Sequence, residues 1–233
     1  MGIRICAVAQ SMSKRGRSDA ENEDRVAYDV GSGRFAVADG ASTSARSEVW
    51  SEILVNAFTR DGVDPLAPDV LDRLRQAWWK QVARPGLPWW AVEKLPQGAA
   101  AAFVGLTVRE TGYRVRAIGD SCLFHLRGEE ILLAGPLDRA DRFSRFPALI
   151  TTRPHAAATV AIWEGGGSYD AGDVFVLATD AMAKHLLQDY QTAGRLLPVA
   201  KYLESPEAFG DFVARARENG MDNDDTTACV VQT

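Results

Sequence analysis

The chain has 233 residues, 46% of them hydrophobic and 24% charged, as in ordinary globular domains. This length suits a single domain, and we expect residues 1–233 to form one. The net charge of −5, without a basic stripe, argues against nucleic-acid binding. No apolar run is long enough to span a bilayer, and the N-terminal segment predicts a strand and not a signal peptide. We therefore expect a cytoplasmic protein that binds neither nucleic acid nor membrane.

Cysteines and histidines give no sign of a disulfide framework or a zinc site. The cysteines lie far apart and lack CxxC spacing, so we expect buried reduced thiols: Cys6, Cys122 and Cys229. The histidines lack metal-ligand spacing: His125, His155 and His185.

The first part of the chain predicts strands followed by helices. A short apolar run predicts a strand at Ile3–Gln10. Two further runs, separated by a Gly-Ser-Gly turn, predict the strands Arg25–Val30 and Arg34–Ala38. Apolar positions at helical spacing predict two helices, 43–60 and Ala67–Val82. The stretch Pro85–Pro96 is less regular. Its Trp89-Trp90 pair could mark a docking surface, but packing beneath a loop is commoner.

The second part predicts a run of strands, then helices and a last strand. Successive antiparallel strands are predicted at Gly98–Val108, Tyr113–Ile118, Ser121–Leu126 and Ile131–Leu133. Residues 135–168, with several prolines and three consecutive glycines at 165–167, predict irregular structure or a flap over the site.

The remaining predicted elements are a strand at Asp173–Thr179, a helix from about Met182, a short helix at Leu196–Leu203, a helix from Ser205 to about Glu218, and a strand at Thr226–Gln232. Strands and helices do not alternate regularly along the chain. Antiparallel sheets covered by helices therefore fit this order better than a doubly wound parallel sheet.

Aspartates recur at the ends of these apolar runs: Asp39 in FAVADG, Asp120 in VRAIGDS, Asp180 in VFVLATD, and Asp224 with Asp225 before the last strand. Each one alone could be an ordinary turn residue. Several carboxylates converging at the rim of a sheet, however, leave negative charge that a cation must neutralise. Repetition in order therefore favours metal binding, and oxygen ligands favour Mg²⁺ or Mn²⁺.

The ordered motifs NEDR, AVADGAS, GAAAAF, AIGDS, LATDAM and DNDDTTACVV resemble the metal-dependent protein phosphatases of the type 2C serine/threonine class, bacterial type. The resemblance extends from about residue 5 to 232. It implies an α+β fold, a four-layer α/β/β/α sandwich of two antiparallel β-sheets flanked by helices. It also implies hydrolysis of phosphoserine and phosphothreonine by hydroxide held between two Mn²⁺ or Mg²⁺ ions, on protein substrates phosphorylated by a serine/threonine kinase.

The resemblance assigns metal-binding roles to five residues. Asp39 would bridge the two metals, and the carbonyl of Gly40 would complete one coordination sphere. Asp180 and Asp224 would hold the first metal, and Asp120 would help to hold a third, weaker one.

The resemblance also assigns the catalytic acidic pair and the phosphate clamp. Glu23 and Asp24 match the pair that orients metal-bound water, although Asp24, like Asp225, could be a mere strand-end polar residue. The clamp arginine usually stands five residues before the Asp of this pair, where this chain has Asp19. We carry the role over to Arg17, with Arg15 as the other nearby arginine.

Two further positions depart from the family pattern. The usual Asp-Gly-X-Gly-Gly becomes Asp-Gly-Ala-Ser-Thr at 39–43, and Ala181 replaces the glycine after Asp180. Neither change removes a metal ligand.

Three functions remain open from the sequence. The first is an active phosphatase. The second is a weakly active or inactive phosphatase-fold regulatory module that acts through a protein partner. The altered phosphate clamp and the tryptophan pairs favour this second function. The third is a metal-dependent hydrolase of a small phosphorylated molecule. Retention of the core aspartates favours the first, because carboxylates clustered without a metal are unfavourable.

Overall fold

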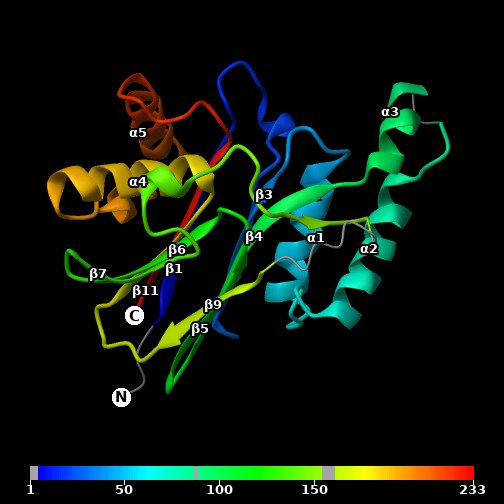
Figure 1. The fold of residues 1–233 in the computed structure, drawn as a ribbon. Coiled ribbons are helices and arrows are strands. Elements are labelled where there is room, and N and C mark those ends of the chain that lie inside the picture. The colour runs from blue at the N-terminus through cyan, green and yellow to red at the C-terminus, as the bar shows by residue number, and fades with distance from the viewer. Residues whose placement is uncertain (1–4, 87–88, 154–160) are drawn as a thin grey trace.

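The computed structural model describes residues 5–86, 89–153 and 161–233. Ile3 and His155, named above, lie outside these ranges. Two antiparallel β-sheets face each other, and helices cover the outer side of each (Figure 1). This arrangement confirms the predicted α+β fold with two sheets between helical layers.

The first sheet has the strand order β1-β11-β10-β6-β7. Its strands are β1 (Cys6–Met12), β11 (Thr226–Gln232), β10 (Val174–Ala178), β6 (Cys122–Arg127) and β7 (Glu130–Gly135). The C-terminal strand β11 lies between β1 and β10, and it pairs antiparallel with both. The first and last strands of the chain therefore lie side by side at one edge of this sheet.

The second sheet has the order β2-β3-β4-β5-β9, with a short β8 paired to β4. Its strands are β2 (Arg25–Asp29), β3 (Arg34–Gly40), β4 (Ala100–Arg109), β5 (Gly112–Ile118), β8 (Ile150–Thr151) and β9 (Trp163–Gly167).

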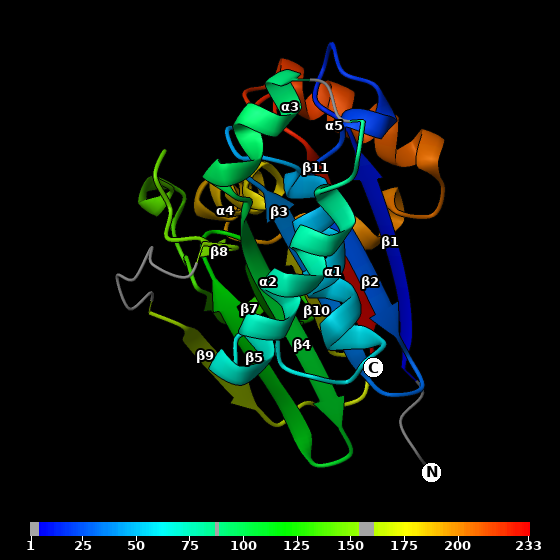
Figure 2. The same ribbon diagram turned by 90° about the vertical axis from the view of Figure 1, so that its right-hand side faces the viewer.

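Two helices cover each sheet. Helices α1 (Ser47–Thr59) and α2 (Pro68–Val82) lie over the second sheet, with the short α3 (Trp89–Lys94) beyond them (Figure 2). Helices α4 (Asp180–Ala193) and α5 (Pro206–Glu218) lie against the first sheet. Ser205 caps α5 as predicted, since its hydroxyl accepts a hydrogen bond from the backbone N–H of Ala208 at 3.1 Å.

Three hydrophobic layers hold the sandwich together. Successive residues of a strand point to opposite faces of its sheet, so β3 sends Phe35 and Val37 between the sheets and Ala36 and Ala38 toward α1. Because helices cover the outer faces, both faces of the central strands are buried. This burial explains why their sequences are apolar without clear alternation.

Three predicted elements need correction. The region Pro85–Pro96, expected to be irregular, contains α3. The glycine run 165–167 is not a flap but the end of strand β9, which pairs with β5. Helix α4 begins at Asp180, two residues earlier than expected, so a candidate ligand forms its first turn.

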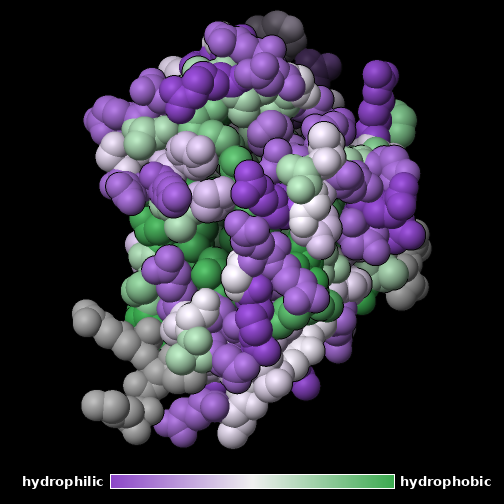
Figure 3. Space-filling view, turned by 90° about the vertical axis from the view of Figure 1, so that its left-hand side faces the viewer, coloured by the Kyte–Doolittle hydropathy of each residue, from purple (hydrophilic) through white to green (hydrophobic). Residues whose placement is uncertain are grey.

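Two expected burials also differ. Cys6 is exposed, whereas Cys122 and Cys229 are buried as expected. Trp89 is 78% exposed and does not pack beneath a loop. Elsewhere on the surface, hydrophilic residues cover most of the side formed by α4 and β7, with hydrophobic ones showing between them (Figure 3). In the described parts of the chain, the helices are too short or too polar to cross a membrane.

Candidate metal centre

The two sheets bring the sequence-predicted aspartates to one end of the sandwich. Asp39 lies near the end of β3, and Asp24 directly precedes β2, whose first residue pairs with Ala38. Asp180 follows β10, and Asp224 stands just before β11, which runs antiparallel to β10. Asp120 follows β5. Antiparallel pairing places the end of one strand beside the start of the next, and this is why residues far apart in sequence converge.

A cleft of about 710 Å³ opens at this end. Four of the candidate ligands line it, Asp39, Asp120, Asp180 and Asp224, together with Gly40. Residues of the segment 143–149, which contains no helix or strand, also line this cleft.

Asp24 is buried and Asp39 is half-buried, and both have strongly perturbed carboxyl groups. Burial raises the pKa of Asp39 well above its usual range, and the negative charges of Asp24, Asp180, Asp120 and Asp224 raise it further. Burial also raises the pKa of Asp24, and hydrogen bonds from Thr179 and Thr227 only partly offset this effect. The Thr179 hydroxyl donates to Asp24 Oδ2 at 2.9 Å.

The other oxygen of Asp24 has no such partner. Asp24 Oδ1 is buried, and no group in the described residues forms a hydrogen bond with it. A buried carboxylate oxygen without a partner is unfavourable. It therefore indicates that a donor or cation belongs beside it.

Asp120 and Asp180 show the same electrostatic effect. Burial and the charge of Asp180 raise the pKa of Asp120 to about 7. Burial and the charge of Asp224 raise the pKa of Asp180 to about 6, although the N–H of Ala181 donates to Asp180 Oδ1. The carboxylates thus repel one another, and a cation bound among them would relieve this repulsion.

Gly40 is required by the close approach of two segments. A Cβ at this position would lie 2.7 Å from the backbone oxygen of Glu23 and 2.9 Å from Cβ of Ser47. The Glu23 carboxylate accepts hydrogen bonds from the hydroxyls of Ser47, at 2.8 Å, and Ser42. The absence of a side chain at Gly40 therefore lets the acidic pair approach the end of β3.

Asp225 has a structural role that the sequence left open. Its Oδ1 accepts from the backbone N–H of Lys14 at 2.9 Å, and its Oδ2 accepts from that of Glu23 at 2.7 Å. Both oxygens thus fix the two ends of the loop 14–23 against the start of β11. Asp225 positions this loop and is not itself among the proposed ligands.

The basic residues of the loop point in different directions. Arg17 is exposed and pairs with Glu21 at 2.6 Å. Arg15 is exposed as well, and it pairs with Glu218 at 3.7 Å. Arg17 nevertheless lines a second, smaller hollow of about 330 Å³, next to Glu23 and Lys14.

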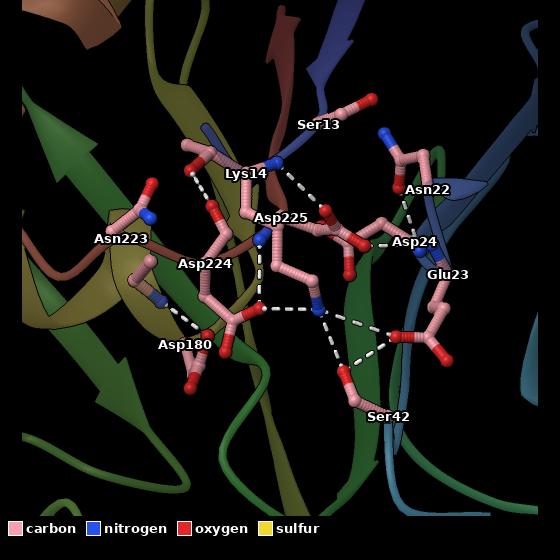
Figure 4. A network of polar contacts seen from close by, with 12 residues as sticks. Ser13, Lys14, Asn22, Glu23, Asp24, Ser42, Asp180, Asn223, Asp224 and Asp225 are labelled. Atoms are coloured by element: carbon pink, nitrogen blue, oxygen red, sulfur yellow. Dashed lines mark hydrogen bonds and ion pairs between the residues drawn. The ribbon is translucent and has the colours of Figure 1, made fainter. Parts of the chain in front are cut away.

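Sequence reasoning missed Lys14, whose ammonium reaches the acidic cluster (Figure 4). It also missed Arg217 of α5, a buried guanidinium that donates to the backbone oxygens of Ser13 at 3.1 Å and Asp224 at 2.6 Å. The signal that could have indicated Lys14 is its position two residues beyond β1, because this is the end of the sheet at which Asp224 also lies.

The residues present, carboxylates with oxygen donors only, fit oxygen-liganded divalent cations. Within the described residues, no three carboxylate, imidazole or thiolate groups enclose a metal position. Asp180 turns one oxygen to the N–H of Ala181, and Asp224 Oδ1 accepts from the N–H of Asp225 at 2.9 Å. The unpartnered oxygen of Asp24 and the mutual repulsion of the cluster favour a cation.

The fold and the acidic cleft together define a class of protein, a two-sheet sandwich with carboxylates at one end. The sequence model for protein phosphatase 2C matches residues 13–223, which is most of the chain. The chain belongs to this family. No curated protein sequence matches it.

Solved structures show the same fold at low sequence identity. PppA, described as a key regulatory component of the T6SS in Pseudomonas aeruginosa, is 18% identical, with a TM-score of 0.65 and coverage of 99% of this chain and 98% of that one. The Mycobacterium tuberculosis serine/threonine phosphatase PstP/Ppp is 20% identical, with a TM-score of 0.62 and 98% coverage of both chains. A structure of the PstP catalytic domain holds two manganese ions; it is 20% identical, with a TM-score of 0.60 and coverage of 98% and 97%.

Proposed function

We propose that this protein is a metal-dependent serine/threonine protein phosphatase that uses Mn²⁺ or Mg²⁺. The observation that carries the proposal is the convergence of buried, mutually repelling carboxylates at one end of the two sheets. Membership of the family and the two manganese ions in PstP support the same chemistry. The substrate would be a protein phosphorylated by a serine/threonine kinase, and the whole chain would act as one cytoplasmic domain.

The proposed ligands are those that line the cleft. Asp39 would bind both metals, because the charges of the other aspartates of the cluster all raise its pKa, which indicates that it lies close to each of them. Asp180 and Asp224 would hold one metal, the carbonyl of Gly40 would contribute to the other, and Asp120 would help to hold a third. When bound, the metals would lower the pKa of water to supply a nucleophile and would neutralise phosphate oxygens.

The residues of the chain itself would position the reactants. Glu23 is held by Ser42 and Ser47, and Asp24 by Thr179, so that this pair can accept hydrogen bonds from water in a fixed direction. We retain Arg17 as the proposed phosphate clamp, because it lines the hollow beside Glu23. A guanidinium can bind two phosphate oxygens at once.

The regulatory alternative has no specific observation in its favour. PppA is called a regulatory component, but at 18% identity the likeness shows the fold alone. A module without metal chemistry would gain from losing the repelling charges, whereas this chain keeps all of them.

The test is hydrolysis of a phosphoserine or phosphothreonine peptide with purified protein. We expect phosphate release that requires added Mn²⁺ or Mg²⁺ and stops with EDTA. Full activity in EDTA would contradict the proposal. Release of phosphate from small metabolites but not from any phosphopeptide would favour the small-molecule hydrolase.

A further inference from the structure

Lys14 lies at the edge of the proposed metal centre, where it lines the smaller hollow next to Glu23 and its ammonium reaches one proposed ligand, Asp224. Its Nζ is 3.3 Å from Asp224 Oδ1, 3.3 Å from Glu23 Oε2 and 2.7 Å from the hydroxyl oxygen of Ser42 (Figure 4). An ammonium group has three N–H donors, and here each has an oxygen partner. The side chain is only 19% exposed, so these contacts are partly shielded from solvent.

The position of this ammonium follows from the fold of the backbone around it and not from a chance orientation of the side chain. Asp225 accepts from the backbone N–H groups of both Lys14 and Glu23, which fixes two of the charged residues relative to each other. Arg217 donates to the backbone of Ser13 and of Asp224, which fixes the third. The side chain of Lys14 therefore starts from a backbone that is tied to both of its carboxylate partners.

No other basic residue in the described part of the chain forms an ion pair with a proposed ligand or with Glu23. Arg15 and Arg17 pair with glutamates outside the cleft. Lys184 lines the cleft of the proposed ligands, but its ammonium pairs at 2.7 Å with Asp222, which is not a proposed ligand. Lys14 is thus distinguished by its partner, and not merely by its charge.

We propose that Lys14 lowers the affinity of this site for divalent metal ions; this inference rests on the proposed function. Its ammonium neutralises Asp224 and Glu23 in the metal-free protein, and a divalent cation must displace it from Asp224 to bind there. The two cations compete for Asp224, because an ammonium and a divalent ion bound to one carboxylate oxygen repel each other. Lys14 therefore stabilises the metal-free fold and weakens metal binding by the same contact.

Replacing the ammonium separates these two effects. Lys14→Met keeps an unbranched apolar chain of similar length but removes the charge. We expect Mn²⁺ to bind about tenfold more tightly, because the metal no longer competes with a partly buried ion pair. We also expect the metal-free variant to melt below the wild type, and this difference to disappear in saturating Mn²⁺.

The experiment is isothermal titration of wild type, Lys14→Met and Lys184→Met with Mn²⁺ alone, together with melting curves in EDTA. Lys184→Met is the matched control, since it removes one positive charge from the cleft of the proposed ligands without freeing any of them. We expect it to change the Kd by less than about threefold. Lys14→Gln, which retains a donor for Ser42, should show the same gain in affinity as Lys14→Met and replaces it if that variant folds poorly.

The outcomes separate this inference from the function on which it rests. Mn²⁺ binding by the wild type with unchanged or weaker affinity in both Lys14 variants would refute the role of Lys14 and leave the proposed function standing. Equal gains in the Lys14 and Lys184 variants would also refute it, since charge alone would then explain the result. Absence of Mn²⁺ binding by all variants would refute both.

Discussion

The two ends of strand β10 hold buried carboxylates in opposite electrostatic settings. Asp173, just before the strand, accepts two hydrogen bonds of 2.8 Å from Arg127, and one of 2.9 Å joins it to His125 Nε2. The backbone N–H of Asp170 donates to it as well. These partners, Arg127 above all, hold the pKa of Asp173 well below its usual range. Asp180, just after the strand, has its pKa raised to about 6 by burial and by Asp224.

The contrast separates a structural carboxylate from one that awaits a ligand. Around Asp173 the protein supplies every partner itself, including Tyr113, which hydrogen-bonds to the other nitrogen of His125 at 3.0 Å. Around Asp180 and Asp39 it supplies several negative charges, while the ammonium of Lys14 pairs with Asp224. Such uncompensated charge is unfavourable for the fold alone. We infer that the first end serves stability and the second serves binding.

The largest expected effect is that of Asp39→Asn on catalysis. An amide is a neutral and weaker ligand, so we expect phosphopeptide hydrolysis to fall by about 1,000-fold or more. The metal-free protein should become more stable, because one repelling charge is gone. Hydrolysis assays and urea denaturation in EDTA measure the two effects. Undiminished activity would remove Asp39 from the proposed mechanism.

The corresponding change at the other end of β10 should act on stability alone. Asp173→Asn removes the buried anion that Arg127 and His125 share, although Arg127 keeps its ion pair with Asp170, and we expect a loss of about 3 kcal/mol in the free energy of unfolding. The Kd for Mn²⁺ should stay unchanged. Weaker metal binding in this variant would show that the two ends are coupled and would undermine the comparison.

The pH dependence of this difference has a definite sign. Because the pKa of Asp173 is lower in the folded state, its ionised form stabilises the fold. This contribution is fully present above the unfolded-state pKa of about 4 and is lost as the pH falls through the lower folded-state pKa. The stability gap between wild type and Asp173→Asn, measured by urea denaturation, should be constant from pH 7 to 5 and shrink below pH 4. A gap that widens in acid would contradict this assignment.

Metal itself should stabilise the acidic end. A ligand that binds only the folded protein adds about 2.7 kcal/mol at 100 times its Kd. We expect the melting temperature to rise with Mn²⁺ and to return with EDTA. Asp173→Asn should keep this increase and Asp39→Asn should lose it, so the pair of variants assigns the effect to one end. An equal increase in both would place the metal elsewhere.

The sequence predicted the strands well because their signal is local. Arg34–Ala38 and Thr226–Gln232 are short apolar runs bounded by polar or glycine residues, and each forms a strand. The glycine run of β9 was misread because glycine favours turns, whereas pairing with β5 overrides that preference at the sheet edge. Helix α4 was predicted to begin too late, because the position of Asp180 depends on where β10 ends in the sheet.

The convergence of the aspartates could be expected from repetition, but their partners could not. Asp24 gains a hydrogen bond from Thr179, 155 positions away, and Lys14 reaches Asp224, 210 positions away. Such contacts follow from strand order across both sheets, which spacing along the chain does not encode. The basic run around Lys14 resembles an ordinary solvated loop until the start of β11 is placed beside it.

The smallest expected effect concerns Arg17 at the edge of the acidic end. Its guanidinium now pairs with Glu21 on the surface, and to bind phosphate it must exchange that partner. Since an exposed ion pair contributes about 0–1 kcal/mol, the exchange is easy and the net gain from a clamp is modest. We expect Arg17→Ala to raise KM for a phosphopeptide about threefold to tenfold, with kcat and the Kd for Mn²⁺ unchanged, because the guanidinium touches the phosphate and not the metals.

Arg15→Ala is the matched control for this measurement. Arg15 lies on the same loop and is equally exposed, but it bonds to the backbone oxygen of Ala214 and to Glu218, on the α5 side and away from the hollow beside Glu23. Steady-state kinetics of both variants with one phosphopeptide give the comparison. Equal, negligible changes would show that neither arginine holds the substrate. Phosphate would then have to be bound by metal and by Lys14, the remaining cation of the loop, whose release from Asp224 would make it available.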